Sequence, residues 1–494
     1  MGPPIFLFPV VVLQEKWVWG YNYPVFGKDF YENHIPGAKA TLKWVADQDF
    51  DYGPALALIS FSLLVIGLFV FGVSTGQVLS VFFALTPIWL PAILFYVFFN
   101  KWMDMVGAAF SLKQGRTTLR LRLPPEVFKS PEAMEFVISQ IHNTANPDNL
   151  MQTYLNGKRP LPVSFELASI GGEVRFYVNV QSKPTKDAIE ANLYAQYPGI
   201  EIIEETVDYA AEIPIDFESD DNEMMAFHMG KKKDGILPIK TYIDYGMDKL
   251  PKEEEKVDPM TPMLEVMASI KPYERIFVQV ICIPFRPESF LNGQMTIGEG
   301  SDWTDKLKST INEIMNRDPK KKVPLGMKGD LGDGDEDRGQ MAMLTMGEKD
   351  MISKLERMSG KYAYNTAIRW LYVTKKGKFN SSIFNQMIRS FSQYDVVGFQ
   401  GIGVRWRTDF DYKDLIPGGK KKALKALKTQ ELVEYRRRLY YPKSGGDGYK
   451  IFTSEELATL FHMPGKVAFT PTLDRVPSTR GEPPANLPIG NLSE

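Results

Sequence analysis

The sequence predicts an α+β protein in which a two-helix transmembrane hairpin is followed by ferredoxin-like modules of the order β-α-β-β-α-β. Three observations predict this architecture. A run of 49 residues between Asp51 and Lys101 contains no charged side chain. From Thr117 onward, short segments alternate between apolar and polar residues, which is the period of a β-strand. Capped segments with helical periodicity lie between these strands.

The composition excludes several broad classes of protein. Of 494 residues, 44% are hydrophobic and 24% are charged, and the formal net charge is −2. These values argue against a wholly disordered or collagen-like chain and against a nucleic-acid protein whose whole surface is basic. The single cysteine, Cys282, permits no internal disulfide. Four scattered histidines do not suggest a zinc site.

Residues 1–50 form an apolar and aromatic N-terminal segment. Pro3–Leu13 is apolar but too short to span a bilayer, and Trp17, Trp19, Tyr21 and Tyr23 follow it closely. Tryptophan and tyrosine favour the membrane–water interface. Two interpretations stay open, an interfacial segment and a small cap packed on the soluble part.

Residues 51–101 contain two stretches of the length needed to cross a bilayer. A crossing helix needs about 20 apolar residues, which fits Ala55–Val73 and Val78–Phe99. A buried helix of a soluble protein is uncharged for only about 10–14 residues, so two such stretches in tandem favour a membrane hairpin. Pro87 and Pro91 predict a kink in the second crossing.

The charges after the second crossing predict its orientation. They are Lys101, Lys113, Arg116, Arg120 and Arg122 against the single acidic residue Asp104. Because cytoplasmic flanks carry an excess of basic residues, we expect a multi-pass protein of the cell inner membrane with both termini in the cytoplasm. The single cysteine agrees with a reducing compartment.

Residues 102–210 contain the first predicted module, whose boundaries carry turn residues. Gly171–Gly172 separates two strands, which is a tight-hairpin signal, and Pro198–Gly199 ends the second helix. The predicted strands are Thr117–Leu123, Val163–Ile170, Glu173–Val180 and Ile200–Glu204, and the predicted helices are 131–141 and 185–197.

Residues 211–270 connect this module to a second α+β module at 271–410. The connection contains a predicted strand, Ile236–Gly246, and a short helix, Met263–Ile270. The second module is predicted from the strands Arg275–Pro284, Tyr364–Thr374 and Gly401–Trp406 and from the helices Asp302–Met315, Lys349–Met358 and Ser382–Tyr394. Because these elements have an insertion and a less regular order, duplication of the first module stays an open interpretation.

Charge blocks and glycines predict a mobile acidic loop at 318–340 inside the second module. Its acidic part runs from Gly329 to Asp337 and is dense in oxygen ligands. A calcium site is the alternative, but the spacing lacks the glutamate that an EF-hand loop carries at its twelfth position. The composition therefore favours a loop.

The most basic stretch lies in a predicted helical region at 411–470. Its cations are Lys420, Lys421, Lys422, Lys425, Lys428, Arg436, Arg437 and Arg438. These side chains are candidates for contact with nucleic-acid phosphates or anionic lipid headgroups, and a solvated helix face is the alternative. Stacking on single-stranded bases is one interpretation of Arg369–Trp370 and Arg405–Trp406. Membership of the strand core is the other. A proline-rich tail occupies 471–494.

Gly72–Gly76 matches the Gly-x-Ser-x-Gly pattern, but it lies at the polar break between the two predicted crossings and not at a strand-to-helix turn, so it does not indicate a nucleophile elbow. The sequence contains no His-Glu-x-x-His pair and no dinucleotide fingerprint. The segment closest to a phosphate loop, Gly334–Gly339, is followed by Gln340 instead of lysine, and its acidic interior would repel phosphate. We therefore expect a protein that is not an enzyme, with no catalytic, cofactor-binding or metal-binding residues.

Several segments resemble a known family. They are Ser164–Leu167, Gly172–Val178, Tyr194–Pro198, Leu237–Tyr242 with Asp244, Ile276–Gln279, Thr453–His462 and Pro483–Pro488. In this order they resemble the N-terminal, non-ATPase region of membrane-anchored conjugation-type ATPases of small-genome bacteria. Those ATPases belong to type IV secretion and DNA-transfer systems and are similar to coupling proteins. Tyr194–Pro198 and Glu455–His462 are the most distinctive segments.

The resemblance implies a split system. In such relatives the proline-rich linker leads into the ATPase domain, whereas the family's ATP-binding residues have no matching positions here. We therefore expect a membrane-anchored scaffold that contacts the lipid bilayer, forms homo-oligomers and docks a separate ATPase. Two alternatives stay open: a DNA-binding membrane protein that uses residues 420–438, and an envelope or virion structural protein.

Overall fold

The computed structural model describes thirteen parts of the chain, and they form two compact units. The described residues are 75–124, 129–142, 144, 146–213, 222–233, 236–249, 257–287, 289–293, 302–315, 345–408, 419–443, 448–465 and 473–476. One unit comprises residues 1–102 and 443–446, and the other comprises 103–442 and 447–494. The N-terminal segment 1–50, the first predicted crossing, the acidic loop 318–340 and most of the tail 471–494 lie outside the described residues.

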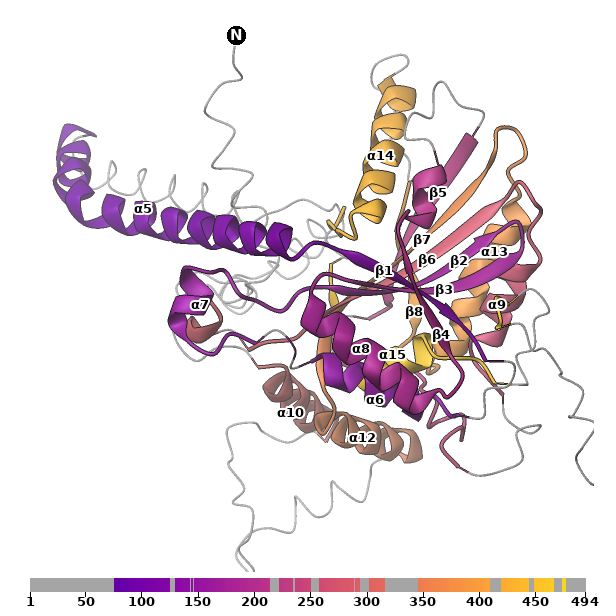
Figure 1. Cartoon of the computed structure of the whole chain (residues 1–494). Helices are drawn as coiled ribbons and strands as arrows, with labels where there is room; N and C mark the ends of the chain where they lie inside the picture. The colour runs from indigo at the N-terminus through magenta and orange to yellow at the C-terminus, as the bar shows by residue number, and fades with distance from the viewer. Residues whose placement is uncertain are drawn as a thin grey trace, which may run out of the picture. The chain divides into compact units, whose positions relative to one another are not determined.

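An antiparallel sheet lies at the centre of the second unit (Figure 1). Within the described residues it has nine strands in the order β4-β1-β3-β2-β6-β7-β5-β8, and β9 pairs with β7. The strands are β1 (Thr117–Arg122), β2 (Val163–Ile170), β3 (Glu173–Val180), β4 (Glu201–Glu205), β5 (Asn222–Lys231), β6 (Arg275–Pro284), β7 (Ala363–Lys375), β8 (Ile402–Arg407) and β9 (Lys450–Thr453). The α+β class that the sequence predicts is therefore confirmed.

The strand order of the first half of the sheet recurs in the second half. The first four strands lie in the order β4-β1-β3-β2, with α6 (Glu132–Ile141) and α8 (Lys183–Gln196) as the two helical connections. Read from the opposite edge, the next four lie in the equivalent order β8-β5-β7-β6, with α9 (Thr261–Ala268) and α13 (Ser381–Ser390) at the equivalent connections. The halves join where β2 pairs with β6, so the sheet is continuous.

Five helices cover one face of this sheet. They are α6, α8, α9, α13 and α15 (Ser454–Leu460), and their apolar residues share one core with alternate strand residues such as Phe165, Val178 and Trp370. This alternation follows from the two-residue period of a strand, which sends Phe165 and Leu167 to one face and Glu166 to the other.

The opposite face is covered by α14 (Gly419–Arg436) and the short 3-10 helix η2 (Tyr209–Glu212). Here Leu432 and Tyr435 of α14 pack with Tyr177, Phe277 and other strand residues. A smaller core joins α10 (Trp303–Ile314) and α12 (Met346–Ser359), which are inserted between β6 and β7. A further 3-10 helix, η5 (Phe391–Tyr394), directly follows α13 in the chain.

Helix α5 (Thr75–Gln114) begins in the first unit, ends in the second and contains the second predicted crossing, Val78–Phe99. Pro87 and Pro91 lie inside it, and the helix bends as the prolines predict (Figure 1). The side chains of many residues in this crossing lie outside the description. Judged on the described residues alone, no helix combines the length and the apolarity that a membrane span requires.

The predicted strand Ile236–Gly246 is wrong, and the strand of this region is β5, which the sequence analysis missed. Residues 236–249 form turns whose backbone amides bond to side chains or to carbonyls of turns instead of a neighbouring strand. The Ile239 amide donates to a Glu456 carboxylate oxygen at 3.0 Å, and the Tyr242 amide donates to the Thr459 hydroxyl at 3.0 Å. Helix α15 therefore takes the place of a pairing strand for this segment.

Candidate functional site

A row of buried polar side chains crosses the sheet beneath α14. Register places Tyr177 opposite Glu166, Glu166 opposite Gln279, Gln279 opposite Arg369, and Arg369 opposite His228. These five residues, called here the polar row, come from five adjacent strands, and none is more than 1% exposed. A buried polar group must find hydrogen-bond partners, because burial without them costs several kcal/mol. The partners come from each other and from α14.

The C-terminal half of α14 supplies the partners of the polar row. Nε2 of His228 lies 2.9 Å from a carboxylate oxygen of Glu431, and both side chains are fully buried. Nη2 of Arg369 donates to the Glu434 carbonyl at 2.9 Å, and the Gln279 amide donates to the Tyr435 carbonyl at 3.3 Å. The helix is thus fixed on the sheet by directional contacts as well as by apolar packing.

Arg438 completes this attachment just beyond the end of α14. Its Nε and Nη2 atoms each donate to Glu166 at 2.9 Å, and the guanidinium also pairs with Asp208. Arg438 has φ of 50°, a left-handed conformation that is costly for a residue other than glycine. The bidentate ion pair offsets that cost.

The Glu166 carboxylate is held in its charged form. Burial alone would raise the pKa of Glu166, but the Arg438 charge and the hydrogen bonds from Arg438, Ser164 and Tyr209 hold this pKa below its ordinary value. Burial likewise opposes the charge of Arg438, whose pKa nevertheless lies above its ordinary value because of Glu166. The two groups therefore stabilise each other's ionised states.

This arrangement revises part of the predicted basic contact surface. Arg438 is 2% exposed, and Arg436 donates to the carbonyls of Ala210, Ala211 and Ile213, so neither guanidinium is available to phosphates. Of the two interpretations of Arg369–Trp370, the structure supports the strand core, because both side chains are fully buried.

The remaining predicted cations lie on or next to α14. Arg437 is exposed, and Lys425 and Lys428 are half-buried. The side chains of Lys420, Lys421 and Lys422 lie outside the description. Trp406 is 5% exposed and Arg405 donates to the Lys232 carbonyl at 3.0 Å, so this pair also serves the fold.

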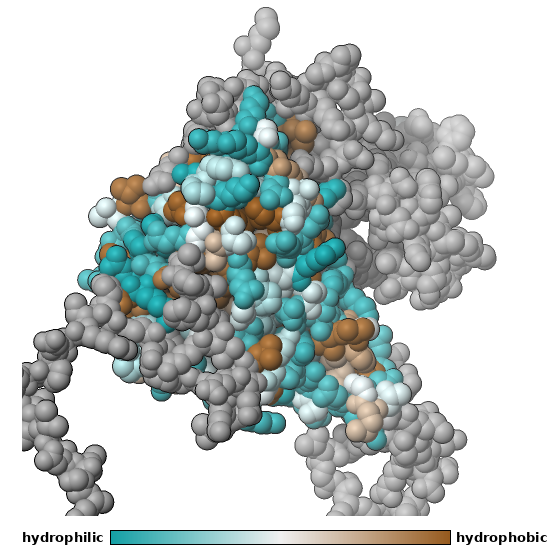
Figure 2. Space-filling view, turned by 90° about the vertical axis from the view of Figure 1, so that its right-hand side faces the viewer, coloured by the Kyte–Doolittle hydropathy of each residue, from teal (hydrophilic) through white to brown (hydrophobic). Residues whose placement is uncertain are grey.

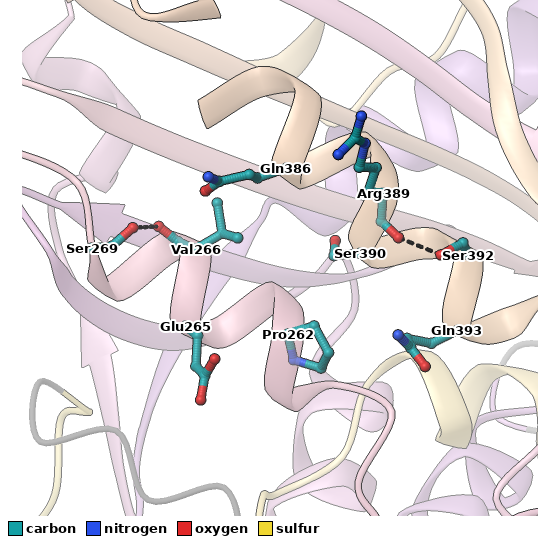
Figure 3. A pocket seen from close by; sticks show the side chains of 9 residues that line it. All are labelled: Pro262, Glu265, Val266, Ser269, Gln386, Arg389, Ser390, Ser392 and Gln393. Atoms are coloured by element: carbon teal, nitrogen blue, oxygen red, sulfur yellow. Dashed lines mark hydrogen bonds between the residues drawn. The ribbon is translucent and has the colours of Figure 1, made fainter. Parts of the chain in front are cut away.

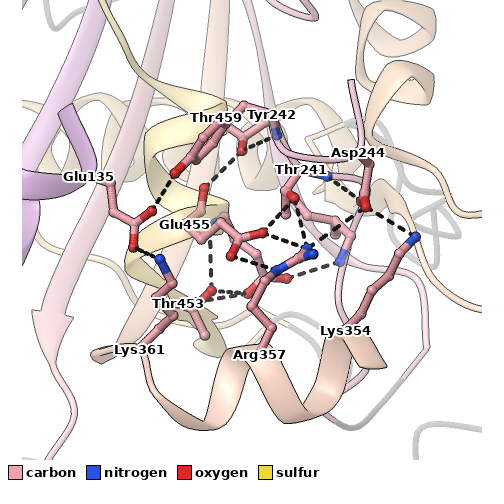
Figure 4. Close-up of polar contacts among 12 residues, drawn as sticks. Glu135, Thr241, Tyr242, Asp244, Lys354, Arg357, Lys361, Thr453, Glu455 and Thr459 are labelled. Atoms are coloured by element: carbon pink, nitrogen blue, oxygen red, sulfur yellow. Dashed lines mark hydrogen bonds and ion pairs between the residues drawn. The ribbon is translucent and has the colours of Figure 1, made fainter. Parts of the chain in front are cut away.

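A second buried polar cluster surrounds the N-terminus of α15 (Figure 4). Glu455 accepts from the Thr241 hydroxyl at 2.6 Å and from Nη2 of Arg357 on α12 at 2.9 Å. Glu135 on α6 accepts from the Tyr242 hydroxyl at 2.7 Å and from Lys361 at 2.7 Å. These contacts, called here the α15 cluster, tie α6, α12, α15 and residues 241–244 together.

Glu456 gives the α15 cluster its most buried ion pair. It forms a capping box with Thr453, in which each side chain bonds to the backbone of the other residue. The same carboxylate lies 2.8 Å from Nζ of Lys231, and both side chains are fully buried. Thr453, Glu455 and Glu456 are therefore all fixed by internal partners.

The surroundings of Glu455 favour the ionised carboxylate less than those of Glu166 do. Burial raises the pKa of its carboxyl above the ordinary value, against the lowering effect of the Thr241 hydrogen bond and of Arg357. Within the described part of the chain, no group of three or more histidine, cysteine, aspartate or glutamate side chains is arranged to hold a metal ion.

A hollow of about 540 Å³ lies between α9 and the segment formed by α13 and η5 (Figure 3). Its lining is Pro262, Glu265, Val266, Ser269, Gln386, Arg389, Ser390, Ser392 and Gln393. Serine and glutamine side chains dominate, with one carboxylate and one guanidinium. Figure 2, seen from the side on which α9 and α13 lie, shows hydrophilic residues around separate apolar groups.

We expect Glu166→Gln to lower the free energy of unfolding by about 3–5 kcal/mol at neutral pH, because it leaves Arg438 buried without its counter-ion. Since the folded pKa of Glu166 is lowered, the contribution is complete above the ordinary pKa of 4.5 and is lost as the pH falls through the lower folded value. Urea denaturation of both proteins against pH should show their difference shrinking below pH 4.5. Glu173→Gln, in a half-exposed pair with Arg175, is the control with a loss of about 1 kcal/mol or less. A pH-independent difference would contradict the assignment.

Glu456→Gln should also destabilise the fold by about 3–5 kcal/mol, because glutamine keeps the capping box but removes the counter-ion of Lys231. The matched control is Glu348→Gln, at the same position of the exposed capping box of α12. We expect the control to change the free energy of unfolding by less than about 0.5 kcal/mol. Equal losses in the two variants, measured by chemical denaturation, would show that capping and not the buried charge matters.

Nearly all of the described residues of the sheet and of the two polar clusters lie within the residues that one family model matches. The model of a family described as a domain of unknown function, DUF8128, matches residues 110–475. This range contains all the described strands, the polar row and the α15 cluster. Among curated proteins, none matches the chain. Because the match covers most of its length, the chain belongs to the DUF8128 family.

Proposed function

We propose that this protein is a non-catalytic, membrane-anchored scaffold of a secretion or DNA-transfer machine, in which it docks a separate ATPase. In this proposal the sheet with its covering helices is a platform built of two ferredoxin-like modules. The transmembrane hairpin holds that platform at the cytoplasmic face of the inner membrane, with both termini in the cytoplasm.

The observation that carries the proposal is the exposure of large apolar side chains on α5. Leu94, Phe95 and Phe98 are 58%, 58% and 61% exposed, and Leu90 and Val97 are more than one-third exposed. Contiguous exposed apolar residues of this size mark an interaction or membrane surface. Together with the uncharged run between Asp51 and Lys101, they favour lipid as the surrounding of this part of the helix.

The end of α5 is joined tightly to the sheet, as an anchor requires. Only Gly115 and Arg116 separate α5 from β1. Arg116 donates to the Asn179 side chain on β3 at 3.2 Å, and the Gln181 side chain accepts from Nε of Arg116 at 3.0 Å and donates to the Ser111 hydroxyl of α5 at 3.3 Å. Burial lowers the pKa of Arg116 to about 10, so the guanidinium stays charged at neutral pH.

The outer strands support the homo-oligomer part of the proposal. Among the described strands, β4 and β8 each pair on one side only. An edge strand presents backbone donors and acceptors that can pair with another chain. The proposed ATPase partner rests on the resemblance of Tyr194–Pro198 and Thr453–His462 to the non-ATPase region of conjugation-type ATPases.

Alkaline carbonate extraction of membranes that contain the full chain tests the anchor. We expect the protein to stay with the membrane, and Leu90→Lys/Leu94→Lys to shift it to the soluble fraction, because a lysine near the centre of a crossing costs about 2.5–3.5 kcal/mol. Leu112→Lys, at a position 84% exposed and beyond the predicted crossing, is the control that should stay with the membrane. Release of the unmodified chain would overturn the proposal, and a lone monomer in mild detergent would overturn its oligomeric part.

A second candidate function is binding of DNA by α14. Residues 419–430 of this helix contain five lysines and no acidic residue, while Glu431, Glu434 and Arg438 hold the other end on the sheet. The helix is therefore a fixed support for a basic segment.

For this function we expect DNA affinity to fall steeply with salt and to drop when Lys420, Lys421, Lys422, Lys425 and Lys428 are replaced by glutamine, because each lost phosphate contact reduces the salt slope by about one. Arg437→Gln is the single-charge control. Salt-independent binding, or no binding, in a fluorescence anisotropy titration would exclude this candidate. An envelope or virion structural role would then be favoured if the chain also copurified without an ATPase.

A further inference from the structure

A compact projection beside the sheet-proximal end of α5 is formed by two segments far apart in sequence. They are α7 (Leu150–Tyr154) with Leu155, and the 3-10 helix η4 (Phe290–Asn292). The Tyr154 hydroxyl donates to the Phe290 carbonyl at 2.6 Å, and the two aromatic rings lie 5.0 Å apart. This projection, called here the knuckle, is seen below α5 in Figure 1.

The knuckle exposes apolar side chains that a water-facing turn has no reason to carry. Met151, Leu155 and Phe290 are 67%, 58% and 56% exposed, and Leu150 is 43% exposed. Val397, by contrast, is a large apolar residue exposed singly. A contiguous exposed group of this kind marks a docking or membrane surface.

Two glycines seat the knuckle directly on α5. Gly157 and Gly293 have φ of 65° and 77°, which other residues rarely adopt. A β-carbon at Gly157 would overlap the Val106 carbonyl of α5, and one at Gly293 would meet the side chains of Met103 and Thr153. The knuckle therefore lies against residues 103–107 of the helix.

This position corresponds to the polar border of a bilayer. Val106 is seven residues beyond Phe99, the end of the predicted crossing, which is about 10 Å along a helix at 1.5 Å per residue. The headgroup region on each side of the hydrocarbon core is about 5–8 Å thick. The knuckle's contact with Met103, about 6 Å beyond Phe99 along the helix, falls within this region, so a projection seated there would meet the headgroups.

The charges around the knuckle suit an anionic membrane surface. The cations of residues 101–114, 148–159 and 286–293 are Lys101, Lys113, Lys158, Arg159 and Arg286, and the acids are Asp104, Asp148 and Glu288. Lys158 pairs with Asp148 at 3.3 Å, and the cations outnumber the acids, so the excess is positive. Basic residues next to exposed apolar side chains are typical of segments that lie in the interface of anionic membranes.

From these observations we propose that the knuckle is a second membrane contact, whose Leu150, Met151, Leu155 and Phe290 side chains enter the headgroup region of an anionic bilayer. The proposal rests on the membrane anchorage proposed above. The two contacts together, α5 and the knuckle, would fix the rotation of the platform as well as its distance from the bilayer.

Spin labels at single cysteines test the proposal in the full chain, because the only native cysteine, Cys282, is 2% exposed and burial raises the pKa of its thiol. Met151→Cys is the reporter, and Val397→Cys, at a position 91% exposed, is the matched water-facing control. Leu94→Cys reports on α5 itself. The chain is reconstituted in phosphatidylcholine vesicles with and without phosphatidylglycerol.

We expect the ratio of collisions with oxygen to collisions with a water-soluble nickel complex to be several-fold higher at position 151 than at 397, and to rise further with phosphatidylglycerol. A water-like ratio at 151 with a lipid-like ratio at 94 would overturn the knuckle contact and leave the anchor intact. Shielding at 151 from both reagents would indicate a protein partner and would also overturn it. Water-like ratios at both positions would instead refute the anchor proposal.

Discussion

The Glu166–Arg438 ion pair is the contact on which the placement of α14 depends. Removing a carboxylate and a guanidinium from water costs several kcal/mol each, and only close, multiple hydrogen bonds offset that cost. Glu166 receives them from Arg438, Ser164, Tyr209 and Gln279. Arg438 reaches the pair with a left-handed backbone, and this conformation sets the direction in which the chain leaves α14. Arg436, two residues earlier, donates to the Ala210 carbonyl of η2.

The α15 cluster likewise gives partners to buried polar and charged groups, on the other face of the sheet. Here one short helix satisfies backbone amides of residues 239 and 242, a buried lysine and an arginine of α12. A segment without a strand partner is thereby fixed in the core. In both clusters, charged side chains serve the fold.

Much of the fold could be predicted from local sequence, and the failures have physical reasons. The bounds of β2, β3 and β6 agree with the prediction because alternation, β-branched residues and the Gly171–Gly172 turn all act locally. β5 was missed because its methionines, alanine and histidine carry no strand preference. Ile236–Gly246 has the composition of a strand, but its amides find α15, a partner more than 200 residues away.

The candidate sites were less predictable than the fold. Arg436, Arg437 and Arg438 read as one basic group with the lysines of α14, yet the burial of Arg438 depends on Glu166, which is more than 250 residues earlier. A signal existed in the sequence, since Glu166 is a lone charge within an otherwise uncharged strand. Such a charge requires a partner, although the sequence does not say which. The knuckle joins residues about 140 apart and left no local signal.

The pairing of β1 has a mechanical consequence. β1 follows α5 after two residues and is bonded on both sides, to β3 and to β4, over most of its length. A pull exerted along the helix would load all of these bonds in shear at the same moment, instead of opening them one after another. A tether attached in this way resists force far better than one attached at a terminal hairpin, which would peel away.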